Sequence, residues 1–373
     1  MPLSVMGHTD SCLNIDLGAI IANWRYIDSL SSATTTTAAM VKANGYGLGA
    51  KNVAAALADA GCTEFFVANL GEAITLRQHL DERGHKQLHI MTLHGCQRDG
   101  LDDHVAFRIT PVLNDLEQLS RWRMCSQQRS ESLPALLHID TGMTRLGFDA
   151  DQIDWLIENK SALDGLDCRY LMSHLVSAEV ADDPTNALQL AAFNECRRCF
   201  PGMPASLANS AGSMLSPDYH FQMTRPGIAL YGADPADQPT DTLMRVVTWQ
   251  ARIIQLRQAK AGDRVGYGGT HLLDRPSCIA TIGVGYADGY NRKLGGKASV
   301  LIGQQTAPVI GRVSMDSITV DVTDIDPAHL QHGFVELLHD DYDLSRMARD
   351  AETIAYEILT RLGPRPSRHY QNS

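Results

Sequence analysis

The sequence has 373 residues, with 32 lysines and arginines against 43 aspartates and glutamates, so its formal net charge is −11. This acidic balance argues against a nucleic-acid-binding protein, which usually carries a concentrated basic face. The hydrophobic content of 44% suits a globular protein of roughly two domains, large enough to fold without disulfide bonds.

The apolar runs are strand-sized and fall short of the roughly 20 residues that a membrane span needs. The first ten residues hold no lysine or arginine before an apolar stretch, so they do not resemble a secretory signal. We predict no membrane association and a cytoplasmic location, in which the eight cysteines stay reduced. Cys196 and Cys199 form a C-x-x-C motif in a helical pattern without a second pair, so no metal is expected.

Short apolar runs alternate with segments of helical period up to about Tyr231. The predicted buried strands are 38–41, 64–68, 88–93, 135–139, 168–172 and 228–230, and the predicted helices are 51–60 and 72–80. This alternation indicates a parallel sheet, and its length fits the about 250 residues of a (β/α)8 barrel. A doubly wound open sheet would show the same alternation, so the periodicity leaves both folds open.

A stretch rich in proline and aspartate, 234–241, indicates a domain boundary. The predicted strands beyond it are 246–256, 277–282, 298–302, 307–310, 317–322 and 334–338, and a last helix is predicted over 347–362. We predict an α/β barrel domain over 1–240, whose first 12 or so residues could pack with the second domain, and a mainly β domain over 241–373.

The motif Val41-Lys42-Ala43-Asn44-Gly45-Tyr46-Gly47-Leu48-Gly49 places a lysine at the end of a predicted strand, before a glycine-rich turn. In a parallel barrel this end of the strands forms the active site. Partial burial there lowers the pKa of a lysine, and the neutral amine can attack an aldehyde to form a Schiff base. A lone lysine could instead simply extend its charged end into solvent; the three glycines and the tyrosine favour the catalytic interpretation.

Two further kinds of motif in the first half of the chain could bind charged groups of a ligand. In the segment 138–147, the guanidinium of Arg145 could hold a carboxylate through two parallel hydrogen bonds. The segments 208–212 and 225–228 could bring a hydroxyl and backbone amides to a phosphate. Each segment alone could also be an ordinary turn.

Glycine-flanked tyrosines mark the second half, in 265–269 and 285–290, and 311–316 is a further polar turn. Glycine leaves a neighbouring ring accessible, so a tyrosine hydroxyl could reach a ligand. Any one of these tyrosines could also be a hairpin residue.

Taken in order, these segments resemble the alanine racemase family, pyridoxal 5'-phosphate (PLP) enzymes built from a barrel followed by a β domain. The resemblance runs from Asn14 to about Tyr356, and its most specific segments are 42–47, 140–147, 225–232, 285–289 and 312–316. It implies an isomerase that interconverts L-alanine and D-alanine with PLP as cofactor, and that supplies D-alanine for peptidoglycan in a bacterial host.

The resemblance also implies roles for single residues. Lys42 would be the Schiff-base lysine, and Tyr267 would be the second catalytic base, reaching the substrate from the partner subunit of a head-to-tail homodimer. The implied cofactor contacts are Lys42, Tyr46, His174, Asn209, Ser210, Arg225, Gly227, Ile228 and Tyr356. The implied substrate contacts are Arg145, Met315, Tyr286 and Asp316.

The chemistry explains why an amine and a phenol are both needed. Racemisation removes a proton from one face of the α-carbon and returns it to the other, which two opposed groups can do without moving. A free phenol, with a pKa of about 10, is a poor base near neutrality. The resemblance places Arg225 on the pyridine nitrogen and His174 between Arg225 and Tyr267, and this cationic relay would favour the phenolate.

The sequence departs from the family at three positions. His138 stands where many members carry a carbamylated lysine that holds the carboxylate-binding arginine, so Arg145 would be oriented by His138 or by a chloride ion. Leu48 replaces a common histidine, and Ser314 replaces a cysteine found in some members.

Three alternatives stay open at this point. One is a related PLP racemase for serine or for a broader set of amino acids, and another is a decarboxylase, against which Arg225 argues. The third is a non-catalytic PLP-binding barrel protein, against which the second domain argues.

Overall fold

The computed structural model describes residues 8–238, 242–331 and 333–372. Its contacts form two compact units: Ile20–Leu230, here called the barrel unit, and the described residues of Met1–Ala19 and Tyr231–Ser373, here called the β unit. The boundary predicted at 240/241 falls within 239–241, outside the described residues, as do the first seven residues of the N-terminal segment.

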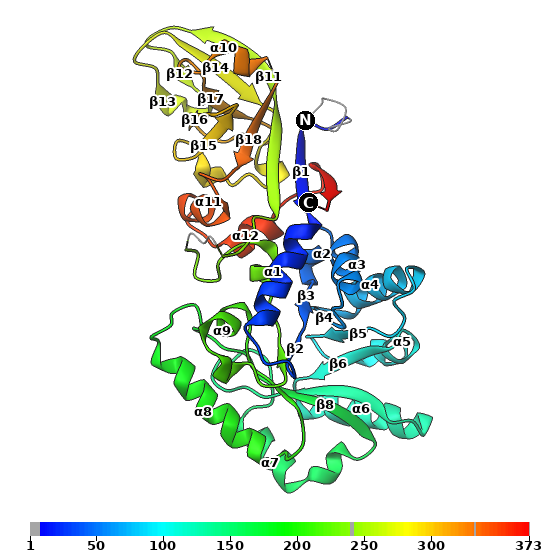
Figure 1. Cartoon of the computed structure of the whole chain (residues 1–373). Helices are drawn as coiled ribbons and strands as arrows, with labels where there is room; N and C mark the ends of the chain where they lie inside the picture. Colours follow the sequence, from blue (N-terminus) through cyan, green and yellow to red (C-terminus); the bar gives the residue numbers. More distant parts are fainter. Residues whose placement is uncertain (1–7, 239–241, 332, 373) are drawn as a thin grey trace. The chain divides into compact units, whose positions relative to one another are not determined.

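The barrel unit alternates strands and helices, as the sequence predicts (Figure 1). Its strands are β2 (Thr36–Thr37), β3 (Ala39–Met40), β4 (Glu64–Val67), β5 (His89–Thr92), β6 (Ile109–Leu113), β7 (Leu133–His138), β8 (Leu166–Met172), β9 (Ala205–Ser206) and β10 (Met223–Thr224). Its helices are α2 (Lys42–Tyr46), α3 (Ala50–Asp59), α4 (Leu70–Glu82), α5 (Leu101–Ala106), α6 (Leu116–Arg129), α7 (Ala150–Glu158), α8 (Pro184–Arg198) and α9 (Ser210–Leu215). Helix α1 (Leu17–Ser29) carries the chain into this unit.

Strands β3 to β9 form one parallel sheet in sequence order, and β10 pairs in parallel with β2. Backbone hydrogen bonds from Ala38 N to Thr224 O (2.9 Å) and from Arg225 N to Ala208 O (2.9 Å) join β10 to both ends of that sheet. Since β2 and β3 share one position, the ring has eight positions. The predicted barrel is confirmed, and the open sheet is excluded.

The prediction of a strand over 228–230 is wrong. This segment forms a 3₁₀ helix, η5 (Ile228–Tyr231), in which Leu230 N donates to Gly227 O (2.9 Å). Its apolar side chains are buried, and periodicity cannot separate a short buried strand from a short buried helical turn.

The β unit contains an eight-stranded sheet in the order β14-β17-β16-β15-β18-β11-β1-β19. These strands are β1 (Ser11–Asp16), β11 (Val247–Ala259), β14 (Ser277–Ile282), β15 (Ser299–Ile302), β16 (Gln305–Ile310), β17 (Ile318–Asp321), β18 (Phe334–Leu338) and β19 (Ser367–Gln371). The N-terminal strand β1 lies antiparallel to β11 and parallel to β19 (Figure 1). A small hairpin joins β12 (Arg264–Val265) and β13 (His271–Leu272), and α10 (Pro327–Leu330) precedes β18.

The single last helix predicted over 347–362 is also wrong. Two helices, α11 (Leu344–Asp350) and α12 (Ala355–Thr360), occupy this region. Glu352 takes a left-handed φ of 55° between them, and Ile354 is extended, so the chain turns where the apolar pattern continues. Within the described residues, no helix combines the length and the apolarity needed to cross a membrane.

Glu64, at the start of β4, gives a prediction for stability. Burial raises the pKa of its carboxyl from an ordinary 4.5 to about 7, although Arg169 acts in the opposite direction. Because the pKa of Glu64 is higher in the folded than in the unfolded state, its protonated side chain contributes fully to the free energy of unfolding below pH 4.5. This contribution is lost as the pH rises to about 7. We therefore expect Glu64→Gln to leave the free energy of unfolding nearly unchanged at pH 4.5 and to raise it by about 1–3 kcal/mol at pH 8. Thermal unfolding of both proteins at the two pH values gives the result. The exposed Glu158→Gln, in α7, is the control, and an effect that does not grow with pH would contradict the prediction.

Candidate active site

Lys42 lies where the chain leaves β3, as the first residue of α2. Its amine is largely buried, and burial lowers its pKa; Arg145 and Arg225 lower it further, while Glu72 opposes them. These surroundings favour the neutral amine, which is the nucleophilic form.

The turn after Lys42 is left-handed over five consecutive residues: φ is 52° at Ala43, 54° at Asn44, 63° at Gly45, 52° at Tyr46 and 81° at Gly47. For a residue other than glycine, this conformation costs about 1–2 kcal/mol. Gly47 N donates to Ala43 O (2.8 Å), and Gly49 N donates to Asn44 O (2.7 Å). Such strain persists only where the surroundings hold it, and it is typical of functional sites.

Glu72, in the first turn of α4, is one of the groups that hold this turn. One carboxylate oxygen accepts from Ala43 N (2.7 Å), and the other accepts from Ala68 N (2.8 Å), just after β4. Glu72 belongs to no sequence motif that predicts this role. The only sequence signal is an acidic residue three positions after Asn69, which caps α4 by accepting from Glu72 N.

Five of the predicted cofactor contacts meet at one place in the barrel unit. The Ser210 hydroxyl accepts from Gly227 N (2.7 Å) and from Ala229 N (3.3 Å). A Cβ atom at Gly227 would lie 2.2 Å from the Tyr46 hydroxyl, so no side chain fits there. The remaining two are Ile228, which is fully buried, and Asn209, which caps α9.

Arg225 is buried without a carboxylate partner among the described residues. Its guanidinium donates to Ser206 Oγ, to Ser173 O and to Leu207 O, while its Nε has no hydrogen-bond partner. Burial lowers its pKa to about 9, which still leaves the guanidinium charged at neutral pH. The site therefore contains a buried cation in which the Nε–H and one Nη1–H are unused within the described residues.

His138, in the same unit, is a neutral imidazole that donates from Nδ1 and leaves Nε2 as an acceptor. Asn114 donates both amide hydrogens to the carbonyls of Leu93 and Val112, so its Oδ1 must accept from His138 Nδ1 (2.8 Å). Burial and the nearby Arg225 lower the His138 pKa to about 4. Nε2 therefore stays unprotonated at neutral pH.

His174 and Arg145 complete the predicted set in the barrel unit. Burial lowers the pKa of His174 well below its ordinary value, and Arg225 and Arg145 lower it further. The residue is therefore neutral at neutral pH. Arg145 itself is exposed, in the segment that follows β7.

The other predicted residues belong to the β unit. Tyr267 opens a 3₁₀ turn, η6 (Tyr267–Gly269), and is 69% exposed. Tyr286 opens another, η7 (Tyr286–Asp288), and Tyr356 lies in α12. Tyr286 N donates to Ser314 O (3.1 Å), which brings Tyr286 beside Met315 and Asp316. Arg365 and Asp288, for which the sequence predicts no role, lie here too, because Arg365 donates to the carboxylates of both Asp288 and Asp316.

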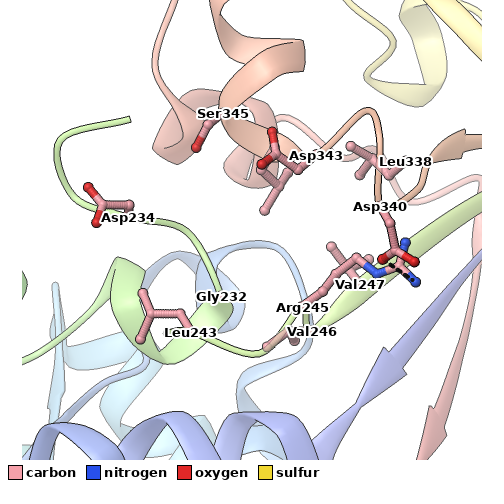
Figure 2. A pocket seen from close by; sticks show the side chains of 11 residues that line it. Gly232, Asp234, Leu243, Arg245, Val246, Val247, Leu338, Asp340, Asp343 and Ser345 are labelled. Atoms are coloured by element: carbon pink, nitrogen blue, oxygen red, sulfur yellow. Dashed lines mark ion pairs between the residues drawn. The ribbon is translucent and has the colours of Figure 1, made fainter. Parts of the chain in front are cut away.

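A cavity of about 340 Å³ in the β unit is distinct from these residues (Figure 2). Asp234, Asp340, Asp343 and Ser345 lie around it, and Arg245 forms an ion pair with Asp340 (3.3 Å). It contains none of the predicted site residues.

The barrel, the largely buried lysine at a strand end and the buried arginine define a class: a β/α-barrel enzyme with a nucleophilic amine, followed by a β domain. Two family models match the chain, described as alanine racemase, N-terminal domain, over residues 15–235, and alanine racemase, C-terminal domain, over residues 246–370. The chain belongs to the alanine racemase family.

Individual relatives agree. The chain is 43% identical to alanine racemase of Brucella suis, over 96% of this chain and 93% of the relative. It is 40% identical to a catabolic alanine racemase of Agrobacterium fabrum, over 98% of this chain and 93% of the relative. Among solved structures it is similar to alanine racemase of Bartonella henselae with covalently bound pyridoxal phosphate, with a TM-score of 0.92, 39% identity, and coverage of 97% of this chain and 99% of that one.

Proposed function

We propose that this protein interconverts L-alanine and D-alanine with PLP as cofactor, using Lys42 and Tyr267 as the two opposed acid–base groups. The observation that carries the proposal is the largely buried Lys42 amine, with its lowered pKa, in a barrel that also holds Arg225 as a buried cation. Family membership supports the same activity.

The residues of the barrel unit fit PLP. The unused Nε–H of Arg225 is a buried donor that matches a ring-nitrogen acceptor. Glycine at position 227 lets the Tyr46 hydroxyl approach the backbone closely beside Ser210, so these groups could together bind a phosphate. We propose that Lys42 holds the aldehyde carbon and that the contacts around the cofactor come from Tyr46, His174, Asn209, Ser210, Gly227, Ile228 and Tyr356. When bound, PLP supplies a sink for the negative charge that forms at the α-carbon.

The residues of this chain then supply the proton transfers. The Lys42 amine takes or returns the proton on one face of the α-carbon. The hydroxyl of Tyr267 of the partner subunit acts on the opposite face. The two active sites would therefore be shared across a homodimer, with the β domain of one copy completing the barrel of the other.

His174 connects the buried cation to the second base. Neutral His174 can accept a hydrogen bond from the Arg225 side chain on one ring nitrogen and donate from the other to the Tyr267 oxygen. Because Arg225 stays charged, this arrangement stabilises the phenolate.

The substrate carboxylate would be bound by Arg145 and by the Met315 amide, and Tyr286 would narrow the entrance. No hydrogen bond within the described residues uses the Met315 N–H, which leaves it for a ligand. We propose that alanine is the substrate rather than serine or a larger amino acid, that the protein is cytoplasmic, and that D-alanine for peptidoglycan is its product. The similarity to a relative named as catabolic makes the opposite direction the alternative.

Deuterium exchange tests this function. Incubation of the PLP-loaded protein with L-alanine or D-alanine in D₂O should place deuterium at the α-carbon and yield the opposite enantiomer, as mass spectrometry and chiral chromatography would show. A panel of amino acids in the same assay gives the specificity. A protein that binds PLP but exchanges no α-proton would be a non-catalytic carrier and would overturn the proposal.

A further inference from the structure

Two neighbouring loops of the β unit carry the proposed substrate contacts Tyr286 and Met315. Ala287 N donates to Met315 O (3.0 Å), and Tyr286 N donates to Ser314 O (3.1 Å). A Cβ atom at Gly285 would lie 2.3 Å from Met315 O, so only glycine permits this approach. The position of one loop therefore depends on the position of the other.

Arg365, which comes just before β19, bridges the two loops with all three of its guanidinium nitrogens. Nε and Nη2 donate to the two carboxylate oxygens of Asp288, at 2.7 and 2.8 Å. Nη1 donates to Asp316 Oδ1 at 2.6 Å. The first loop is thus tied through Asp288, and the second through Asp316.

The two ion pairs differ in strength. Asp288 is 3% exposed, and the oxygen bound to Nη2 also accepts from Gly285 N (2.8 Å), so this carboxylate fixes the start of its loop. The pair is bidentate and its carboxylate is buried, although the Arg365 side chain is about half exposed, so breaking it would leave a buried carboxylate without its charged partner. The Asp316 carboxylate is exposed, and a pair with it contributes little to stability. The Asp316 contact is therefore better explained as setting the position of the second loop.

We propose that Arg365 is a positioning residue that fixes the Met315 amide relative to Tyr286 for binding of the substrate carboxylate, and that Asp316 acts through Arg365 rather than on the substrate. The proposal rests on the proposed function. The planar guanidinium holds two carboxylates at a fixed spacing, which a lysine ammonium cannot do. A displacement of about 1 Å at a binding group can reduce the rate by up to about 10²-fold.

The experiment uses the PLP-loaded protein and the variants Arg365→Met and Arg365→Lys. We expect KM for alanine to rise about tenfold while kcat falls less than about threefold, with the lysine variant resembling the methionine variant. Hydrogen exchange at the Tyr286 and Ala287 amides should become faster in both variants, independently of catalysis. Asp316→Asn should raise KM and add little to the effect of Arg365→Met.

Arg275→Met is the matched control, because Arg275 forms an exposed, bidentate pair with Asp324 elsewhere in the β unit. It should leave KM unchanged. Normal KM in both Arg365 variants, unchanged exchange at Tyr286 and Ala287, or additive effects of Arg365→Met and Asp316→Asn would overturn the inference. A wild-type protein without α-proton exchange would instead overturn the proposed function, and the amide exchange rates would still test whether Arg365 holds the loops.

Discussion

Tyr267→Phe is expected to lower racemisation by about 10²–10⁴-fold, the range for loss of a general acid–base group. The change removes only the hydroxyl from an exposed ring, so folding and cofactor content should stay normal. The rates of the L-to-D and D-to-L reactions should also change differently, because Lys42 can still transfer the proton on its own face of the α-carbon. We therefore expect the α-deuterium isotope effects measured from L-alanine and from D-alanine to diverge in the variant.

Tyr26→Phe, in α1, is the control for loss of a phenol outside the proposed site. It should leave both rates and both isotope effects unchanged. Near-normal rates in Tyr267→Phe, with identical isotope effects in the two directions, would mean that the tyrosine carries no proton and that the two-base proposal is wrong.

Gly227→Ala should strongly weaken cofactor retention, by about tenfold or more. The new Cβ would lie 2.2 Å from the Tyr46 hydroxyl and 2.9 Å from Tyr46 Cζ, so the ring, which is buried, has to shift. Overpacking of this kind typically costs about 1–3 kcal/mol and moves the neighbouring groups. PLP content after dialysis, measured by absorbance, gives the result.

Gly71→Ala, in α4, provides the comparison, because its nearest neighbour would be at an ordinary contact distance of 3.4 Å. Its PLP content should equal that of the wild type. Full retention of PLP by Gly227→Ala would show that this glycine lies outside the cofactor site.

The barrel could be predicted because its central strands are continuous apolar runs. The run at 64–68 gives β4 to within a residue, since both faces of a parallel strand are buried and every residue after Glu64 in this run is apolar. The two-residue strands β9 and β10 carry no such pattern, so the sequence could not show them. The break between α11 and α12 was missed because Glu352 turns the chain without glycine or proline.

The positions of the candidate site residues could be predicted only in part. The placement of Lys42 at a strand end could be predicted because the apolar run and the glycine-rich turn are adjacent in the sequence. Glu72 and Arg365 could not, since their contacts join positions 29 and 77 residues apart, which only the folded chain brings together. Their roles depend on geometry and have no local sequence pattern.

The left-handed turn from Ala43 to Gly47 also limits how this region can vary. A β-branched residue at position 43 or 44 would meet a steric barrier whatever its chemistry, whereas glycine or asparagine would meet less. In a mutational library over this segment, many variants would accordingly be lost because their side chains cannot adopt this backbone conformation, whatever their effect on activity. An engineer who wishes to retune the lysine would do better to vary its neighbours on α4 than the segment that presents it.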